Sequence, residues 1–297
     1  MPRTRILSTL RHSLLAFVFG AVLSPAAMAQ SATDLSTLLR ETHVHGLAFD
    51  PSTPGRLLIA THNGLHGLDA ITLTMTPLGA SRDDFMGFTT LPTGTAPLYA
   101  SGHPARGGNL GVISSMDGGQ TWTPLSDGVD GPVDFHVMDV SRADAQVLYG
   151  AHAGMLQTSR DGGRSWAIIG PAPARLIDIA TSARDADMLL AATEAGLLRS
   201  TDRGATWTRA HPVTAPVSLV DVGTDGRVLA FVLGAGLVQA DETTLDWAVV
   251  NDSFGDGYLL HLARDPANPL RIFAVTGQAE MLASQDGGVT WQLVARP

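Results

Sequence analysis

The chain has 297 residues, of which 44% are hydrophobic and 16% charged, and it contains no cysteine. A chain of this length can bury a sizeable core, and the lack of cysteine excludes disulfides as a source of stability. Its net charge of −9 disfavours nucleic acid and anionic membranes as partners and favours cations.

Residues 1–29 have the pattern of a signal peptide. Arg3, Arg5 and Arg11 form a basic start, residues 14–23 form a short apolar run, and residues 27–29 read Ala-Met-Ala, a cleavage sequence. The run is too short for a membrane span. We therefore expect cleavage after Ala29, a periplasmic or secreted protein with no membrane span, and a mature charge of −12 once the three arginines are lost. Residues 30–42 form an N-terminal segment that does not read as a strand.

One unit recurs along the remaining chain and ends at each of the five tryptophans. Its pattern is S-x-D-x-G-x-x-W, found at residues 115–122, 159–166, 200–207 and 284–291, with a worn copy at 240–247. Successive tryptophans are 44, 41, 40 and 44 residues apart. This period indicates repeated supersecondary units that bury their faces against one another.

Alignment of the repeats gives six units, at residues 43–79, 84–125, 134–169, 175–210, 215–250 and 258–295. Each reads as an apolar inner strand, a second strand, a glycine-led third strand, the recurring turn and a fourth strand. Six units of four antiparallel strands predict an all-β, six-bladed β-propeller that occupies residues 43–297 as a single domain. The first unit lacks the turn motif and its tryptophan, as a terminal repeat often does.

The recurring unit resembles the Asp-box, or BNR, repeat of sialidases and sialidase-like propellers. The resemblance implies that its aspartates stabilise outer hairpins away from the central site; they are Asp117, Asp161, Asp202 and Asp286. Residues 43–47, 82–88, 101–104 and 131–136 also resemble an exported Asp-box family labelled glycosylhydrolase-like. That second resemblance covers essentially the whole mature chain and implies a sialidase-like propeller.

The chain departs from true sialidases at their catalytic groups. Those enzymes hold the substrate carboxylate with three arginines and use a tyrosine nucleophile, but the F-R-I-P type segment that introduces the first arginine is absent here. Tyr99 and Tyr149 lie inside predicted second strands. Sialidase activity is therefore not expected.

Polar residues gather where inner strands begin. In a propeller, the linkers between blades and the loops after second strands open on one face, here called the linker face. Measured from the turn that follows each inner strand, His45 and His136 share one position with Met86. His43, Asp84 and Asp134 share another position two residues earlier. Residues two apart on a strand point to the same side, so both sets face one way.

A second set of polar residues follows the second strands. His62, His152 and Glu194 align without gaps, which predicts equivalent places on the linker face, and a longer loop at residues 101–109 carries His103. Imidazole and carboxylate donors suit zinc, copper(II), nickel or iron. The candidate metal ligands are His43, His45, His62, Asp84, His103, Asp134, His136 and His152.

These residues support two functions and one purely structural interpretation. The chain is either an exported protein that binds a metal ion or small ligand in this His/Asp-lined pit, or an extracytoplasmic glycoside hydrolase-like enzyme. The enzyme would use Asp84 and Asp134 as catalytic carboxylates, which requires a separation of about 5 to 10 Å. In the structural interpretation the histidines are hydrogen-bonded polar residues that line a wet pore.

Overall fold

A computed structural model describes residues 1–2, 34–92, 94 and 96–297. The chain divides into two units, Met1–Gln30 and Ser31–Pro297, and the second contains every described helix and strand. The predicted signal peptide and its cleavage at Ala29 lie outside the described residues, apart from the first two positions. In the part of the chain that the structure describes, no helix combines the length and apolarity needed to cross a membrane.

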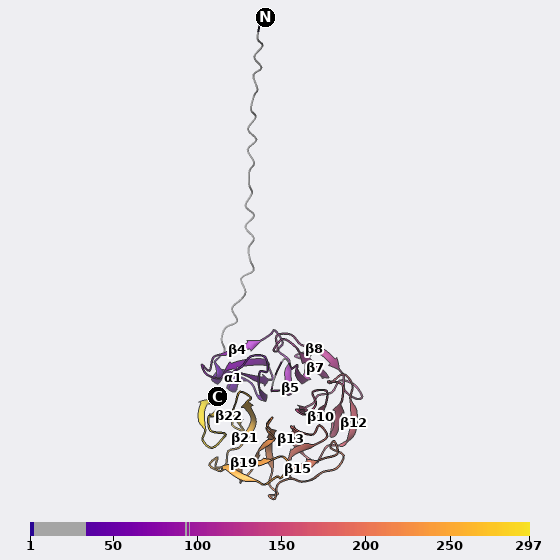
Figure 1. Cartoon of the computed structure of the whole chain (residues 1–297), viewed down its shortest axis with the longest axis vertical. Coiled ribbons are helices and arrows are strands. Elements are labelled where there is room, and N and C mark those ends of the chain that lie inside the picture. The colour runs from indigo at the N-terminus through magenta and orange to yellow at the C-terminus, as the bar shows by residue number, and fades with distance from the viewer. Residues whose placement is uncertain (3–33, 93, 95) are drawn as a thin grey trace. The chain divides into compact units, whose positions relative to one another are not determined.

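Six four-stranded antiparallel sheets form a ring, which confirms the six-bladed propeller (Figure 1). Blade 1 contains β1 (Val44–Phe49), β2 (Arg56–Thr61), β3 (Gly64–Asp69) and β4 (Met75–Leu78). Blade 2 contains β5 (Asp84–Thr90), β6 (Leu98–His103), β7 (Val112–Ser115) and β8 (Thr123–Ser126). Blade 3 contains β9 (Val137–Val140), β10 (Leu148–His152), β11 (Met155–Ser159) and β12 (Ala167–Pro171).

The second half of the ring repeats this plan. Blade 4 contains β13 (Leu176–Thr181), β14 (Leu189–Thr193), β15 (Gly196–Ser200) and β16 (Thr208–Arg209). Blade 5 contains β17 (Val217–Val222), β18 (Arg227–Val232), β19 (Gly236–Asp241) and β20 (Ala248–Asn251). Blade 6 contains β21 (Leu259–Asp265), β22 (Asn268–Thr276), β23 (Met281–Ser284) and β24 (Gln292–Ala295). Strands within each blade follow one another in chain order.

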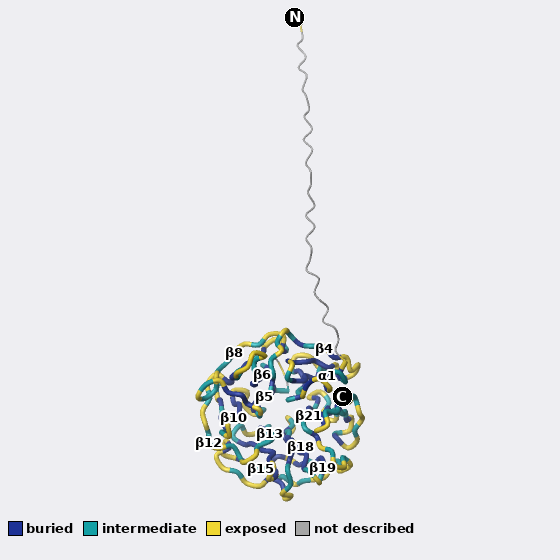
Figure 2. Tube along the Cα trace, turned by 180° about the vertical axis from the view of Figure 1, so that it is seen from behind, coloured by how far each residue is buried: buried dark blue, intermediate teal, exposed yellow. Residues whose placement is uncertain are grey.

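The hydrophobic core lies between neighbouring blades. Leu58 and Leu65 of blade 1, for example, pack in one cluster with Phe85 and Ala100 of blade 2. Buried residues follow the strands of the ring and exposed residues follow its outer rim (Figure 2). A blade therefore buries its faces only against its neighbours, which explains why the sequence repeats with the period of a blade.

The recurring aspartates hold the turns between third and fourth strands. Ser159 and Ser165 donate their hydroxyls to the two carboxylate oxygens of Asp161, at 2.8 and 2.6 Å, and the backbone N–H of Ser165 donates at 2.9 Å. These bonds, that from the Ser165 hydroxyl first, lower the pKa of Asp161 to about 2. Asp117, Asp202 and Asp286 make the same bonds in their own blades. These carboxylates are therefore structural groups of the outer hairpins.

A short helix closes the ring. Helix α1 (Leu35–Glu41) buries Leu38 and Leu39 in a cluster with Phe49 of blade 1 and Phe273 of blade 6. Strands β1 and β21 lie side by side at this junction. The first and last blades are thus joined by side-chain packing, with each sheet built from its own consecutive strands. The sequence did not predict a helix in residues 30–42.

Candidate functional site

The inner strands begin on the linker face, and their hydrogen-bond register supports the predicted alignment. Val44, directly after His43, pairs with Thr61 in blade 1. Phe85, directly after Asp84, pairs with Gly102 in blade 2, so His43 and Asp84 hold equivalent positions. The residue that follows His43, Asp84 or Asp134 is apolar and buried in each case; these residues are Val44, Phe85 and Phe135. Their burial fixes the backbone from which His43, His45, Asp84, Asp134 and His136 project.

The first cluster joins blades 1 and 2. His62 Nδ1 lies 2.6 Å from Asp84 Oδ2, and His45 Nε2 lies 3.2 Å from both ring nitrogens of His62. His45 Nε2 also lies 3.6 Å from Asp84 Oδ1. His43 adds a third imidazole, with its Nδ1 3.3 Å from His62 Nε2. His45, His62 and Asp84 therefore bring donor atoms together on the linker face, and His43 adds an imidazole on the other side of the His62 ring.

Burial governs the charge of His45. The side chain of His45 is 16% exposed, and burial, followed by the nearby His62, lowers the pKa of His45 to about 4. His45 is therefore a neutral imidazole at neutral pH, with a lone pair that can bind a cation. Asp84 Oδ1 is buried and has no hydrogen-bond partner among the described residues.

The second cluster joins blades 2 and 3. His136 Nε2 lies 2.6 Å and His103 Nε2 lies 3.1 Å from Asp134 Oδ2. His103 Nδ1 lies 2.9 Å from the carbonyl oxygen of Gly108, and this bond, together with the charge of Asp134, raises the pKa of His103. The Asp134 side chain is only 9% exposed, and its Oδ1 lacks a hydrogen-bond partner within the described part of the chain.

The structure divides seven of the eight predicted metal ligands between the two clusters. His43, His45, His62 and Asp84 lie in one, and His103, Asp134 and His136 lie in the other. Met86 of blade 2 stands at the position that His45 and His136 occupy in the blades on either side. Each cluster spans a junction between blades.

The predicted equivalence of His62 and His152 is wrong by one residue. His152 pairs with Met155 across a turn formed by Ala153 and Gly154, which adopt left-handed φ angles of 49° and 76°. In blade 1 it is Thr61 that pairs across the turn, with Gly64, so His62 belongs to the turn while His152 belongs to a strand. Among the described residues, His152 is hydrogen-bonded to the backbone of Asp134, with its Nδ1 2.9 Å from the carbonyl oxygen and 3.2 Å from the backbone nitrogen.

The structural counterpart of His62 is His103. His103 comes directly after Gly102, which pairs with Phe85 as Thr61 pairs with Val44. Glu194 holds the same place in blade 4, but it forms an exposed ion pair with Arg175 and joins neither cluster. The longer loop of blade 2 concealed this relation in the sequence.

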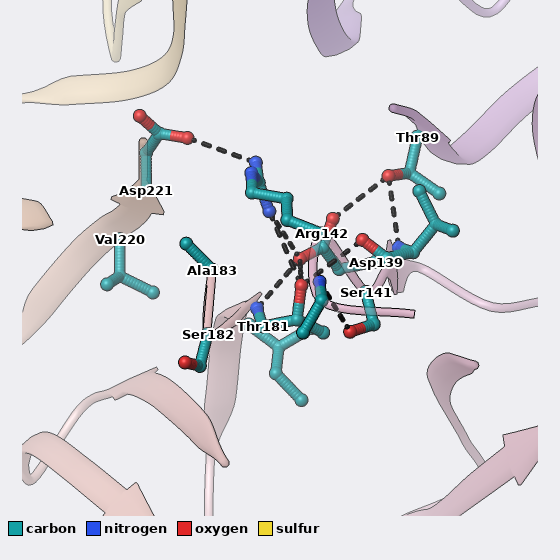
Figure 3. A network of polar contacts seen from close by, with 12 residues as sticks. Thr89, Asp139, Ser141, Arg142, Thr181, Ser182, Ala183, Val220 and Asp221 are labelled. Carbon is teal, nitrogen blue, oxygen red and sulfur yellow. Dashed lines mark hydrogen bonds and ion pairs between the residues drawn. The ribbon is translucent and has the colours of Figure 1, made fainter. Parts of the chain in front are cut away.

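A cavity of about 220 Å3 runs along the axis of the ring below the two clusters. His45, Met86 and His136 line its linker-face end. Deeper, Arg142 bridges two blades, with one guanidinium nitrogen 3.1 Å from Asp139 and the other 3.4 Å from Asp221, as Figure 3 shows. Thr181 donates its N–H to the same Asp139 oxygen at 2.8 Å. This network therefore connects inner strands across the axis.

Two further groups in the cavity were missed by the sequence interpretation. Burial raises the pKa of Asp178 to about 7, although two backbone N–H groups, those of Val220 and Ile179, donate to it. Burial also lowers the pKa of His261 to about 4, and its Nε2 lies 3.0 Å from the carbonyl oxygen of Val44. Both interrupt apolar inner strands, and that interruption is the signal that could have identified them.

Comparison with known proteins gives the fold and no closer relationship. No protein-family model and no curated protein matches the sequence. Among solved structures, the chain is similar to a GH74 enzyme from Niastella koreensis, with a TM-score of 0.62 and 16% identity over 85% of this chain. It spans only 45% of the length of that enzyme.

Two other solved propellers are also similar. The extracellular domain of BT4673, named as part of a hybrid two-component system of B. thetaiotaomicron, has a TM-score of 0.58 and 15% identity, over 90% of this chain and 35% of that one. YCF48 bound to a D1 peptide has a TM-score of 0.54 and 16% identity, over 85% of this chain and 82% of that one. Identities this low establish a shared propeller fold alone.

Proposed function

We propose that this protein is an exported, sialidase-like propeller that binds a divalent transition-metal ion on its linker face. The observation that carries the proposal is the first cluster, in which donor atoms of His45, His62 and Asp84 lie within 4.8 Å of one another. They come from two blades, and the first and last of them, His45 and Asp84, are 39 residues apart in the sequence. His43 supplies a further imidazole beside His62.

The chemistry of this donor set favours a first-row ion of borderline softness. Neutral imidazole nitrogens with one carboxylate suit Zn²⁺, Cu²⁺, Ni²⁺ or Fe²⁺, whereas Ca²⁺ and Mg²⁺ prefer oxygen ligands. Ring nitrogens 3.2 and 3.3 Å apart repel one another when their lone pairs converge, unless a proton or a cation lies between them. A bound cation would relieve that repulsion and satisfy the buried Asp84 Oδ1.

The charge of the chain and its N-terminal pattern support the remaining parts of the proposal. The acidic mature sequence attracts cations to the surface before they bind. Export is proposed from the signal-peptide pattern of residues 1–29, and a similarity to an extracellular propeller domain agrees with it.

A glycoside hydrolase-like activity is the second candidate, favoured by the similarity to a GH74 enzyme. In it, Asp84 and Asp134 would be the paired carboxylates on the linker face. Each already has a histidine nitrogen 2.6 Å from its Oδ2, which is an arrangement suited to proton transfer as well as to metal binding.

Metal analysis of the mature protein, purified without a His tag, tests both candidates. We expect at least one equivalent of a first-row metal by mass spectrometry and no turnover of a panel of glycosides. Once a chelator has removed that metal, titration with Zn²⁺ should give a binding heat. Binding should be lost in His45→Ala and retained in Glu194→Ala, which removes an acid from the turn position of blade 4. Absence of metal and of heat would overturn the proposal. Glycoside turnover that disappears in Asp84→Asn or Asp134→Asn would establish the hydrolase instead.

A further inference from the structure

We propose that the linker face binds a second divalent transition-metal ion, held by His103, Asp134 and His136. The inference rests on the proposed function for the class of metal, but its ligands are a separate set of side chains. Donor atoms of these three residues lie within 4.8 Å of one another, as do those of the first cluster. The two sets have no residue in common.

The first argument is that the two clusters share one pair of groups, related by rotation about the ring. In each, a histidine at the end of the second strand contacts an aspartate from the inner-strand start of the next blade. The third ligands are not equivalent, because His45 comes from the preceding blade of its junction and His136 from the following one. His62 contacts Asp84 at 2.6 Å, and His103 contacts Asp134 at 3.1 Å. Their structural equivalence follows from the register that places Thr61 opposite Val44 and Gly102 opposite Phe85.

The second argument is the state of Asp134. Its side chain is more than nine-tenths buried, and Oδ1 has no hydrogen-bond partner among the described residues. A buried carboxylate oxygen without a donor costs on the order of 1 to 3 kcal/mol, so such atoms in native proteins usually have a purpose. Coordination of a cation would give Asp134 Oδ1 a partner and would also use the neighbouring imidazoles of His103 and His136.

The third argument is the orientation of His103. Its Nδ1 is engaged with the carbonyl oxygen of Gly108 at 2.9 Å, which leaves Nε2 directed at Asp134. Metal-binding histidines in proteins are usually fixed in this way, with the nitrogen that does not bind the metal donating to a carbonyl or carboxylate. The loop at residues 101–109 thus orients a ligand as well as carrying it.

The next junction of the ring provides an internal contrast. Between blades 3 and 4, Arg175 stands where Asp84 and Asp134 stand, because the Glu194 N–H donates to the Arg175 carbonyl oxygen as the His62 N–H donates to that of His43. An arginine cannot bind a metal ion, and this one pairs with Glu194. This junction therefore lacks the donor design, which needs both an aspartate at the inner-strand start and a histidine at the end of the second strand.

Calorimetric titration of the mature chain with Zn²⁺ tests the inference, with circular dichroism as a check on folding. Wild type should bind two equivalents. His103→Gln and His136→Gln, which alter side chains that are 41% and 59% exposed, should each remove one equivalent or weaken it by at least about 100-fold. His45→Ala should remove the other equivalent, and Glu194→Ala should retain both.

The outcomes separate this inference from the proposed function. No binding by wild type would overturn both. One equivalent that His45→Ala removes and His103→Gln retains would leave the proposed function in place and overturn the second site. One equivalent that either substitution removes would mean a single shared ion and would also overturn it. One equivalent lost only in His103→Gln or His136→Gln would support the second cluster and overturn the first.

Discussion

Asp84 lies directly opposite His103 in the register of β5 and β6, yet the two side chains contact different blades. Asp84 meets His62 of blade 1, whereas His103 meets Asp134 of blade 3. Blade 2 therefore contributes one group to each cluster from a single pair of neighbouring residues. Because this pair is held by a strand ladder, a displacement of β5 against β6 alters both clusters together.

The first prediction concerns specificity among histidines. His45→Ala should weaken binding of Zn²⁺ to the first cluster by at least about 100-fold, because it removes one of the three convergent donors. His211→Ala removes a buried imidazole that follows blade 4, whose Nδ1 accepts the N–H of Val213, and should leave binding unchanged. Calorimetry at pH 7.5 makes the comparison. Equal losses in the two variants would assign these histidines a general structural role.

The second prediction separates the outer turns from the site. Asp161→Ala removes the acceptor of four hydrogen bonds and should lower the free energy of unfolding by about 1 to 3 kcal/mol. Metal binding should not change, because the turn lies between third and fourth strands. Urea unfolding and zinc titration of the same variant measure both effects. A loss of zinc binding in a folded Asp161→Ala protein would contradict the separation.

The third prediction tests how the ring is closed. Leu39→Ala removes a side chain that is 3% exposed from the cluster between blades 1 and 6, and should cost about 2 to 5 kcal/mol of unfolding free energy. Hydrogen exchange should accelerate first in β1 and β21, which meet at that junction. Arg40→Ala, on the exposed side of the same helix, is the control and should change stability by less than about 0.5 kcal/mol. Uniform acceleration around the ring would argue against a local seal.

Much of this architecture is predictable from the sequence because each blade repeats the same local signals. The tryptophan period gives the number of blades, and the distance from each inner-strand start to its turn places His43, Asp84 and Asp134 at equivalent positions. Neither inference needs a knowledge of how blades pack. Both depend only on the period of a strand and the spacing of repeats.

The features that were missed depend on information that is not local. A gapless match of the sequence aligns His62 with His152, whereas the structure shifts the two by one residue. The shift arises from the left-handed φ angles of Ala153 and Gly154, which the sequence match does not reveal. Helix α1 is short and forms where its leucines fill the gap between the first and last blades, which are far apart in the sequence. Asp178 shows only as a polar interruption of an apolar strand, and its neighbours come from other blades.

The last prediction uses the buried acid of the axial cavity. Burial raises the pKa of Asp178 from 3.8 to about 7, so between these pH values the folded protein holds a proton that the unfolded chain has lost. The stabilisation is complete below about pH 4 and is lost as the pH rises through about 7, by on the order of 2 to 4 kcal/mol. Nearby Asp139 and Asp221 add to the shift, and Arg142 shares the cavity.

Asp178→Asn cannot lose a proton, so this contribution to the pH dependence should vanish. An amide also turns its NH₂ group toward one of the two backbone N–H donors, those of Ile179 and Val220, and this lowers stability equally at every pH. The informative quantity is therefore the difference in unfolding free energy between pH 5 and pH 8, measured in urea for both proteins. That difference should be smaller in Asp178→Asn by about 2 kcal/mol or more. The same difference in variant and wild type would mean that Asp178 is ionised in the folded protein at pH 5, held so by Arg142 across the cavity.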